Sequence, residues 1–202
     1  MIKAVSGALA LSLMAAGAAQ PASVVKTYSY FSVGGSTLDE IEEQLARRGP
    51  QLRNTGQRHP GATRMQFNTR LDYEDYNGRC RVSKATVTVR ANVILPRWRR
   101  NRKADNDVRI IWDTLAADIK RHEERHVAIA KNHARDMEKA LMAIAPQRGC
   151  AAMAEKAKAV SANLLGRHDR AQAEFDRVEG INFESRMLRL LRYRLERMEA
   201  AR

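Results

Sequence analysis

Apolar and polar residues alternate along three segments in the first half of the chain, and a period of two is typical of β-strands. The pattern predicts strands over residues 24–33, 63–73 and 79–95. Asn77-Gly78 separates the second strand from the third, and this dipeptide favours a tight hairpin turn. We therefore expect a small antiparallel sheet of three or four strands.

Local signals define the ends of these elements. The apolar series of the third strand changes register near Lys84, and Pro96-Arg97-Trp98 is expected to end that strand. Between the first two strands, Thr37-Leu38-Asp39-Glu40 is a capping box that predicts a short helix ending at Gly49-Pro50. The polar, turn-rich residues 51–62 are expected to form a loop.

The second half of the chain has the helical period of 3.6 residues. After a basic linker over residues 97–103, helices are predicted from Asp105 or Asn106 to Ile144, from about Cys150 to Glu179, and from Phe183 to Ala200. The expected fold class is α+β, with strands and one short helix over residues 24–96 and long helices over residues 104–201. Residues 20–202 can bury one core, so a single domain is expected.

Residues 1–19 have the composition of a secretory signal peptide. Lys3 supplies a positive charge, residues 4–16 are apolar, and cleavage is expected after Ala18 or Ala19. The apolar run is shorter than a membrane span requires, and an uncleaved amino-terminal anchor is the alternative. The mature protein is expected to be periplasmic or secreted.

The chain has two cysteines, Cys80 and Cys150. An even number of cysteines in an oxidising compartment favours one disulfide, which would join the strand region to the end of the first long helix. Two buried free thiols are the alternative.

The charge balance is strongly basic, with 36 Lys and Arg residues against 23 Asp and Glu residues, a net charge of +13 and a pI near 10.3. In a cytoplasmic protein this balance would favour nucleic acid as a partner, but the export signal removes most of the support for that class. The charge instead predicts membrane lipids, lipopolysaccharide or acidic cell-wall polymers, unless it serves solubility alone.

The strongest chemical signal is His122-Glu123-Glu124-Arg125-His126, which fits the H-E-x-x-H pattern of zinc proteases. His122 and His126 are four residues apart in a predicted helix, so both imidazoles can reach one metal ion. Glu123 lies beside that face, where its carboxylate can accept a proton from a zinc-activated water. The alternative is a chance match on a solvated, charged helix surface.

The motif leaves the third metal ligand undefined. His133 lies near the same helix face, but it is too far along a helix that has no glycine between residues 127 and 132. A zincin-like arrangement would take the ligand from a second, crossing helix. The candidates on the next predicted helix are His168, Asp169, Glu174, Asp176 and Glu179.

The chain resembles a family of uncharacterised bacterial proteins described as predicted secreted zinc-dependent proteases. The resemblance covers about residues 28–176. It rests on the order of several short motifs: Gly34-Gly35-Ser36-Thr37, Gly49-Pro50, Gly61-Ala62-Thr63, Cys80, Leu95-Pro96-Arg97-Trp98, Trp112 and the His122–His126 segment. It implies a peptidase with Zn²⁺ as cofactor and does not identify a substrate.

One part of the family pattern differs in this chain. Where the family has Tyr-Asp-x-x-Thr-x-His-Gly, this chain has Phe175-Asp176-Arg177-Val178-Glu179-Gly180-Ile181-Asn182. The Asp is kept, so the resemblance implies Asp176 as the third ligand, with Glu179 and His168 as alternatives. Ile181 replaces the His of the pattern. If that His completes the site in the family, this chain must use another ligand or carry an impaired site.

The leading hypothesis is an exported zinc metallopeptidase that cleaves a peptide or protein substrate. His122, His126 and Asp176 would hold Zn²⁺, Glu123 would be the general base, and His168 or Tyr193 could donate a hydrogen bond to the oxyanion. The rival hypothesis is a non-catalytic, basic envelope protein that binds an anionic membrane, a cell-wall polymer or a protein partner. No nucleic-acid partner is expected.

Overall fold

The computed structural model describes residues 22–51, 56–100 and 102–201, so the predicted signal segment lies outside the described residues. The elements, in chain order, are β1 (Ser23–Val33), α1 (Leu38–Arg48), β2 (Ala62–Tyr76), β3 (Arg79–Trp98), α2 (Asn106–Met142), α3 (Cys150–Ile181) and α4 (Phe183–Glu199). The α+β class is confirmed, and every predicted strand and helix is present with its ends shifted by a few residues.

The three strands form one sheet in the order β1-β3-β2. β2 and β3 are an antiparallel hairpin, and the turn residues Asn77 and Gly78 both have positive φ angles, of 54° and 74°. This backbone conformation matches the twist of the flanking strands, which is why Asn-Gly is favoured there. The pairing shifts register between Asp72 and Tyr73, opposite Lys84, where the apolar series predicted a change.

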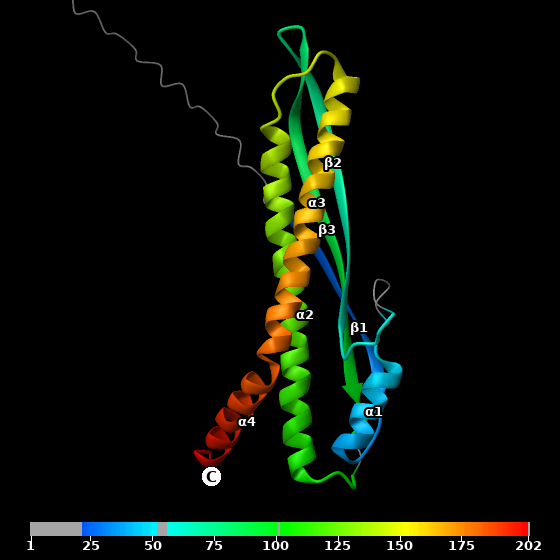
Figure 1. The fold of residues 1–202 in the computed structure, drawn as a ribbon, viewed down its shortest axis with the longest axis vertical. Coiled ribbons are helices and arrows are strands. Elements are labelled where there is room, and N and C mark those ends of the chain that lie inside the picture. Colours follow the sequence, from blue (N-terminus) through cyan, green and yellow to red (C-terminus); the bar gives the residue numbers. More distant parts are fainter. Residues whose placement is uncertain (1–21, 52–55, 101, 202) are drawn as a thin grey trace, which may run out of the picture.

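The prediction of an antiparallel sheet is wrong for β1, which pairs with β3 in the parallel direction. α1 lies at the end of the sheet where β1 finishes, and β2 starts from that end (Figure 1). β1 and β2 therefore run in opposite directions. The hairpin then reverses the chain again, so the central strand β3 runs parallel to β1. Alternation along a strand does not reveal which neighbour it will pair with.

β3 also continues past its predicted end at Pro96. β2 begins opposite Ile94, so residues 95–98 have a strand neighbour on one side only. Proline is tolerated at such a position because fewer ladder hydrogen bonds are required. Trp98 then packs against Trp112 of α2, with ring centroids 5.8 Å apart, and its indole N–H donates to the Gly35 carbonyl at 3.0 Å.

The short helix α1 has the predicted cap. The Thr37 hydroxyl accepts a hydrogen bond from the Glu40 N–H at 3.3 Å, and the Glu40 carboxylate accepts one from the Thr37 N–H at 3.3 Å. Ile41 and Leu45 then pack beside Val33 in the core. This packing fixes the end of the molecule where β1 meets α1.

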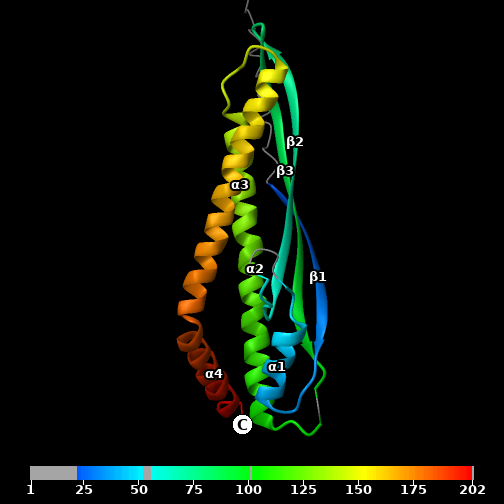
Figure 2. The ribbon, with the colours of Figure 1, turned by 45° about the vertical axis from the view of Figure 1, so that its right-hand side comes forward.

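α2 and α3 run side by side in opposite directions along one face of the sheet, whereas no described helix covers the other face (Figure 2). Small residues of α2, Ala130 and Ala134, are fully buried in the core cluster that contains Val87 and Val89 of β3. Small side chains allow this close approach of helix and sheet. α4 bends away after Asn182 and lies beside the first half of α2 (Figure 1).

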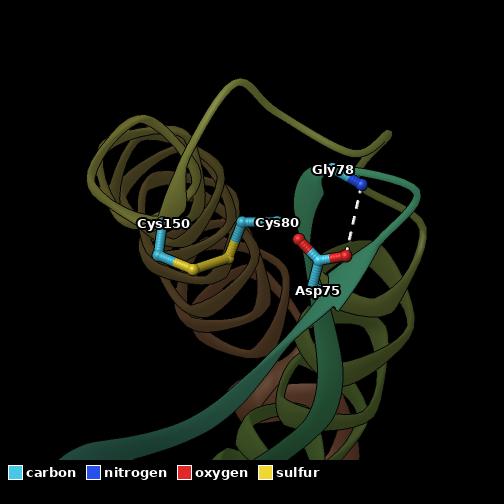
Figure 3. The surroundings of a disulfide bond; sticks show 4 residues. All are labelled: Asp75, Gly78, Cys80 and Cys150. Atoms are coloured by element: carbon cyan, nitrogen blue, oxygen red, sulfur yellow. Dashed lines mark hydrogen bonds between the residues drawn. A yellow bond between two sulfur atoms is a disulfide. The ribbon is translucent and has the colours of Figure 1, made fainter.

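A disulfide joins Cys80 at the start of β3 to Cys150 at the start of α3, with a Cα–Cα distance of 5.1 Å and a sequence separation of 70 (Figure 3). Beside it, the Asp75 carboxylate accepts a hydrogen bond from the Gly78 N–H at 3.2 Å. The predicted disulfide is confirmed. Such cross-links persist in oxidising compartments, which fits the predicted export. Within the described ranges, no helix is long and apolar enough to cross a membrane.

Candidate metal centre

The two histidines of the H-E-x-x-H motif lie in α2 and face α3. Their Nε2 atoms are 3.0 Å apart. Asp176 of α3 places its Oδ1 atom 2.9 Å from His126 Nε2 and 3.2 Å from His122 Nε2. In the described part of the chain, these three residues are the one group of His, Cys, Asp and Glu side chains close enough to hold a metal ion.

The spacing of these three atoms fits a small metal ion. Ligand atoms about 2.0–2.1 Å from a tetrahedral zinc ion are about 3.3 Å from one another. The three distances between the donor atoms of His122, His126 and Asp176 lie close to this value. Two imidazole nitrogens and one carboxylate oxygen are also a usual donor set for catalytic zinc, which keeps its fourth position open.

Gln172 of α3 fixes the orientation and tautomer of His126. The amide nitrogen of Gln172 donates to the His126 main-chain carbonyl at 3.1 Å, so its amide oxygen must be the atom 2.6 Å from His126 Nδ1. Nδ1 therefore carries the hydrogen and donates it. In the neutral imidazole that a metal requires, the lone pair of His126 is on Nε2, which faces the other two ligand candidates. The hydrogen bond from Nδ1 to Gln172 is the outer contact that metal-binding histidines usually make.

His122 is held by a ring and a carboxylate, both from α3. Its imidazole stacks on Phe175 with ring centroids 4.9 Å apart, and the same phenyl ring meets His126 edge-on at 5.1 Å. Glu179 Oε2 lies 3.6 Å from His122 Nδ1. The atom of His122 that faces the group is again Nε2.

Glu123 lies beside this group and is almost completely buried, with 5% of its surface exposed. The Thr63 hydroxyl, near the start of β2, donates to Glu123 Oε2 at 2.7 Å. Gly61 leaves the space for the other oxygen, because a Cβ atom at residue 61 would lie 2.8 Å from Glu123 Oε1. The carboxylate is thus positioned by the segment that enters β2.

The surroundings of the carboxyl groups of Glu123 and Asp176 shift their pKa values in opposite directions. Burial raises the pKa of Glu123 above its ordinary value, against the opposing effect of the Thr63 hydrogen bond. Burial would also raise the pKa of Asp176, but in the metal-free protein the protonated imidazoles of His122 and His126 donate hydrogen bonds to this carboxylate, outweigh burial and hold that pKa well below its usual range. Asp176 is therefore an anion suited to binding a cation, whereas Glu123 has the greater proton affinity that a base requires.

Glu124 faces a different way from Glu123, since adjacent helix residues point about 100° apart. Its carboxylate accepts a hydrogen bond from Lys26 Nζ at 2.6 Å and another from the Tyr28 hydroxyl. Both partners belong to β1. The two adjacent carboxylates of the motif therefore attach α2 to the two outer strands, Glu123 to β2 and Glu124 to β1.

A cavity of about 430 Å³ opens onto the candidate metal group. Gly61 and Thr63 line one side of it, and Phe183 and Arg186 of α4 line another. Asp176 is the most accessible of the three ligand candidates, with 52% of its side chain exposed. The open side of the group therefore faces a space that a ligand can enter.

The other predicted ligand candidates lie elsewhere. His168 is buried behind Gln172, with its Nε2 atom accepting from the Gln172 amide at 2.8 Å. Asp169 and Glu174 are exposed, and Glu174 pairs with Arg177 at 2.7 Å. His133 contacts the His168 ring, at 5.6 Å between centroids, and takes no part in the group, as the helix geometry predicted.

Glu179 belongs to an ion-pair network that joins three helices. Arg186 of α4 donates to both oxygens of the buried Asp118 in α2, at 3.1 and 3.2 Å, and to the main-chain carbonyl of Glu179 at 3.2 Å. Arg121 of α2 donates to Asp118 and to the Glu179 carboxylate. Burial acts to raise the pKa of Glu179, but Arg121 holds it below its ordinary value. Glu179 thus serves mainly to hold the α3–α4 corner.

The two predicted oxyanion donors are not at the cavity. Neither His168 nor Tyr193 is among its lining residues, and Tyr193 instead lines a separate hollow between α2 and α4. Arg186 does reach the cavity, but Asp118 and Glu179 already engage its guanidinium. Ile181, which replaces the His of the family pattern, is 71% exposed at the end of α3 and does not line the cavity.

Sequence reasoning missed Gln172 and gave Thr63 no role. Gln172 lies four residues after His168 and four before Asp176, so helical spacing on α3 would have placed it on the same face. Thr63 and Gly61 have no such signal, because their contact with Glu123 joins segments about 60 residues apart in sequence.

Comparison with known proteins identifies a family for this chain. No curated protein and no solved structure matches the chain. The profile of a family described as "Bacterial protein of unknown function (DUF922)" matches residues 28–184, which include every residue of the candidate centre. The resemblance to an uncharacterised bacterial family is thereby confirmed, whereas the protease class is no part of that description. The chain belongs to the DUF922 family of bacterial proteins.

Proposed function

We propose that this protein is a zinc-dependent peptidase. The observation that carries the proposal is the meeting of three donor atoms, from His122, His126 and Asp176, within 3.2 Å of one another beside the buried carboxylate of Glu123. A cavity on the open side of the group supplies room for a substrate. The H-E-x-x-H pattern of zinc proteases, present at residues 122–126, supports peptide bonds as the target.

The roles of the residues follow from their environments. A bound Zn²⁺ would supply a Lewis acid that lowers the pKa of a water molecule and polarises a carbonyl. Glu123 would accept the proton of the attacking water and deliver it to the leaving amine, because burial gives this carboxyl a raised pKa. Gln172 keeps the lone pair of His126 on Nε2, and Thr63 keeps Glu123 in place.

The first test is the metal content of the purified protein. We expect about one zinc ion per chain by mass spectrometry, and near-complete loss of zinc in His126→Ala, because the remaining two ligands bind zinc weakly. His133→Ala is the matched control, since His133 is on the same helix but outside the group. It should retain zinc. Absence of zinc from the wild type after incubation with the metal would refute the proposal.

Gln172 gives a second, graded test. Replacing Gln172 by Ala removes the acceptor of His126 Nδ1, and loss of such an outer contact typically weakens zinc binding by about 10–100-fold. Competition with a fluorescent chelator measures this change. Glu174→Ala, on the exposed side of α3, should leave the zinc affinity unchanged. Equal affinities for Gln172→Ala and the wild type would show that His126 does not bind the metal through the oriented Nε2.

A further inference from the structure

The uncovered face of the sheet carries an ordered polar surface. In β3, Arg90 and Asn92 alternate with core residues that pack under the helices, so both point away from α2 and α3. Arg90 lies opposite Gln66 of β2 and Val25 of β1. Asn92 lies opposite Arg64 of β2 and Thr27 of β1. We call these two rows of three residues the open face.

The charge on this face is positive and lacks internal compensation. Arg64 and Arg90 are exposed and are diagonal neighbours across the β2–β3 pairing. Among the residues that the structure describes, neither arginine has an ion-pair partner. The nearest acidic position on the same side of β2, Asp72, lies directly opposite Lys84. Two guanidinium groups are therefore available to an external anion.

Hydrogen bonds between side chains hold the polar groups near the two arginines in place. Asn92 donates to the Thr27 hydroxyl at 3.2 Å and accepts from the Ser29 hydroxyl at 2.8 Å. A shallow pocket of about 340 Å³ lies on this surface, and its lining includes Arg64, Arg90, Gln66, Asn92 and Thr27. The pocket thus combines two cationic groups with amides and a hydroxyl on a rigid sheet.

The composition of the pocket selects among anionic partners. Single-stranded nucleic acid is usually bound by stacking on aromatic rings, and no aromatic side chain lines the pocket. A membrane surface is usually bound by an inserted apolar face or by a cluster of about four to eight basic residues. The two rows contain one large apolar side chain, Val25, and two arginines. Carboxylated sugars fit better, because arginine pairs with carboxylates and amides pair with hydroxyl groups.

We propose that the open face binds an acidic polysaccharide. A sugar carboxylate would lie between Arg64 and Arg90, and ring hydroxyls would contact Gln66 and Thr27. The polymer would run across the sheet, on the side opposite the helices and the candidate metal centre (Figure 2). The inference does not depend on metal binding or on hydrolysis.

Polygalacturonate is the probe we would use, with binding measured by biolayer interferometry at low ionic strength. We expect saturable binding that Arg64→Gln with Arg90→Gln weakens by at least about tenfold, because two charge-assisted contacts are lost. Arg189→Gln with Arg192→Gln is the matched control. It removes the same charge from exposed positions of α4 and should change binding by no more than about twofold.

Two further binding experiments distinguish an acidic polysaccharide from other polymers that carry carboxylates. Polyglutamate supplies carboxylates without sugar hydroxyls and should bind more weakly, and Gln66→Ala should reduce binding to polygalacturonate but not to polyglutamate. Equal weakening by both arginine pairs, equal binding of the two polymers, or preferential binding to anionic lipid vesicles would each overturn the proposal. Circular dichroism of the variants checks that they are folded.

Discussion

Replacing Glu123 by Gln is expected to slow hydrolysis by a factor on the order of 10² to 10⁴ while zinc stays bound. The amide can still accept the hydrogen bond of the Thr63 hydroxyl, so the site should keep its shape. It cannot take a proton from water. Because Glu123 contributes no atom to the group of ligand candidates, its replacement should leave the metal content of the protein unchanged.

Glu124→Gln is the matched control for this experiment. It makes the same chemical change at the next residue, whose carboxylate binds Lys26 and Tyr28 of β1 and does not line the cavity. The zinc-loaded proteins would be incubated with unfolded protein substrates, and new peptide ends identified by mass spectrometry. Wild type and Glu124→Gln should produce the same ends at similar rates. Full activity in Glu123→Gln would exclude Glu123 as the base.

Removing the disulfide is the change expected to affect stability most. For Cys80→Ala with Cys150→Ala, the free energy of unfolding should fall by about 4 kcal/mol, because the bond closes a loop with a sequence separation of 70. In a chain of this size the melting temperature should fall by about 10 °C. Urea unfolding followed by circular dichroism measures the loss.

The reduced wild type provides an independent control. A reducing agent should lower the stability of the wild type to nearly that of the double variant and leave the double variant itself unchanged. If the double variant were as stable as the oxidised wild type, the start of α3 would be held by packing of buried residues such as Met153 and Val82 alone.

Local signals predicted the elements of this fold well, and long-range pairing less well. The capping box at Thr37 and Glu40 and the Asn77-Gly78 turn specify structure within a few residues, and both formed as expected. The direction of β1 relative to β3 depends instead on how the chain returns after α1. A strand pattern contains the same alternation whichever neighbour it meets, so the sequence alone could not distinguish a mixed sheet from an antiparallel one.

In the candidate metal centre, too, local signals predict some residues, whereas contacts between distant segments determine others. The spacing within one helix predicts His122, Glu123 and His126, and the match to the family pattern predicts Asp176. The residues that orient them come from far away in sequence: Gln172 is 46 residues from His126, and Thr63 is 60 residues from Glu123. Such contacts depend on how α3 and β2 pack against α2, which periodicity does not determine.

α3 has one link to the rest of the molecule near each of its ends, and the two links are sensitive to different chemical conditions. Cys150 attaches its first turn by a covalent bond, and Asp176, near its other end, would share a metal ion with α2. A reductant would break the disulfide and a chelator would remove the proposed metal, which when bound would add to stability by mass action. Amide hydrogen exchange along α3 would then begin at whichever end had been released. With the proposed metal bound, the rigidity of α3 would depend on both the redox state and the metal supply of its surroundings.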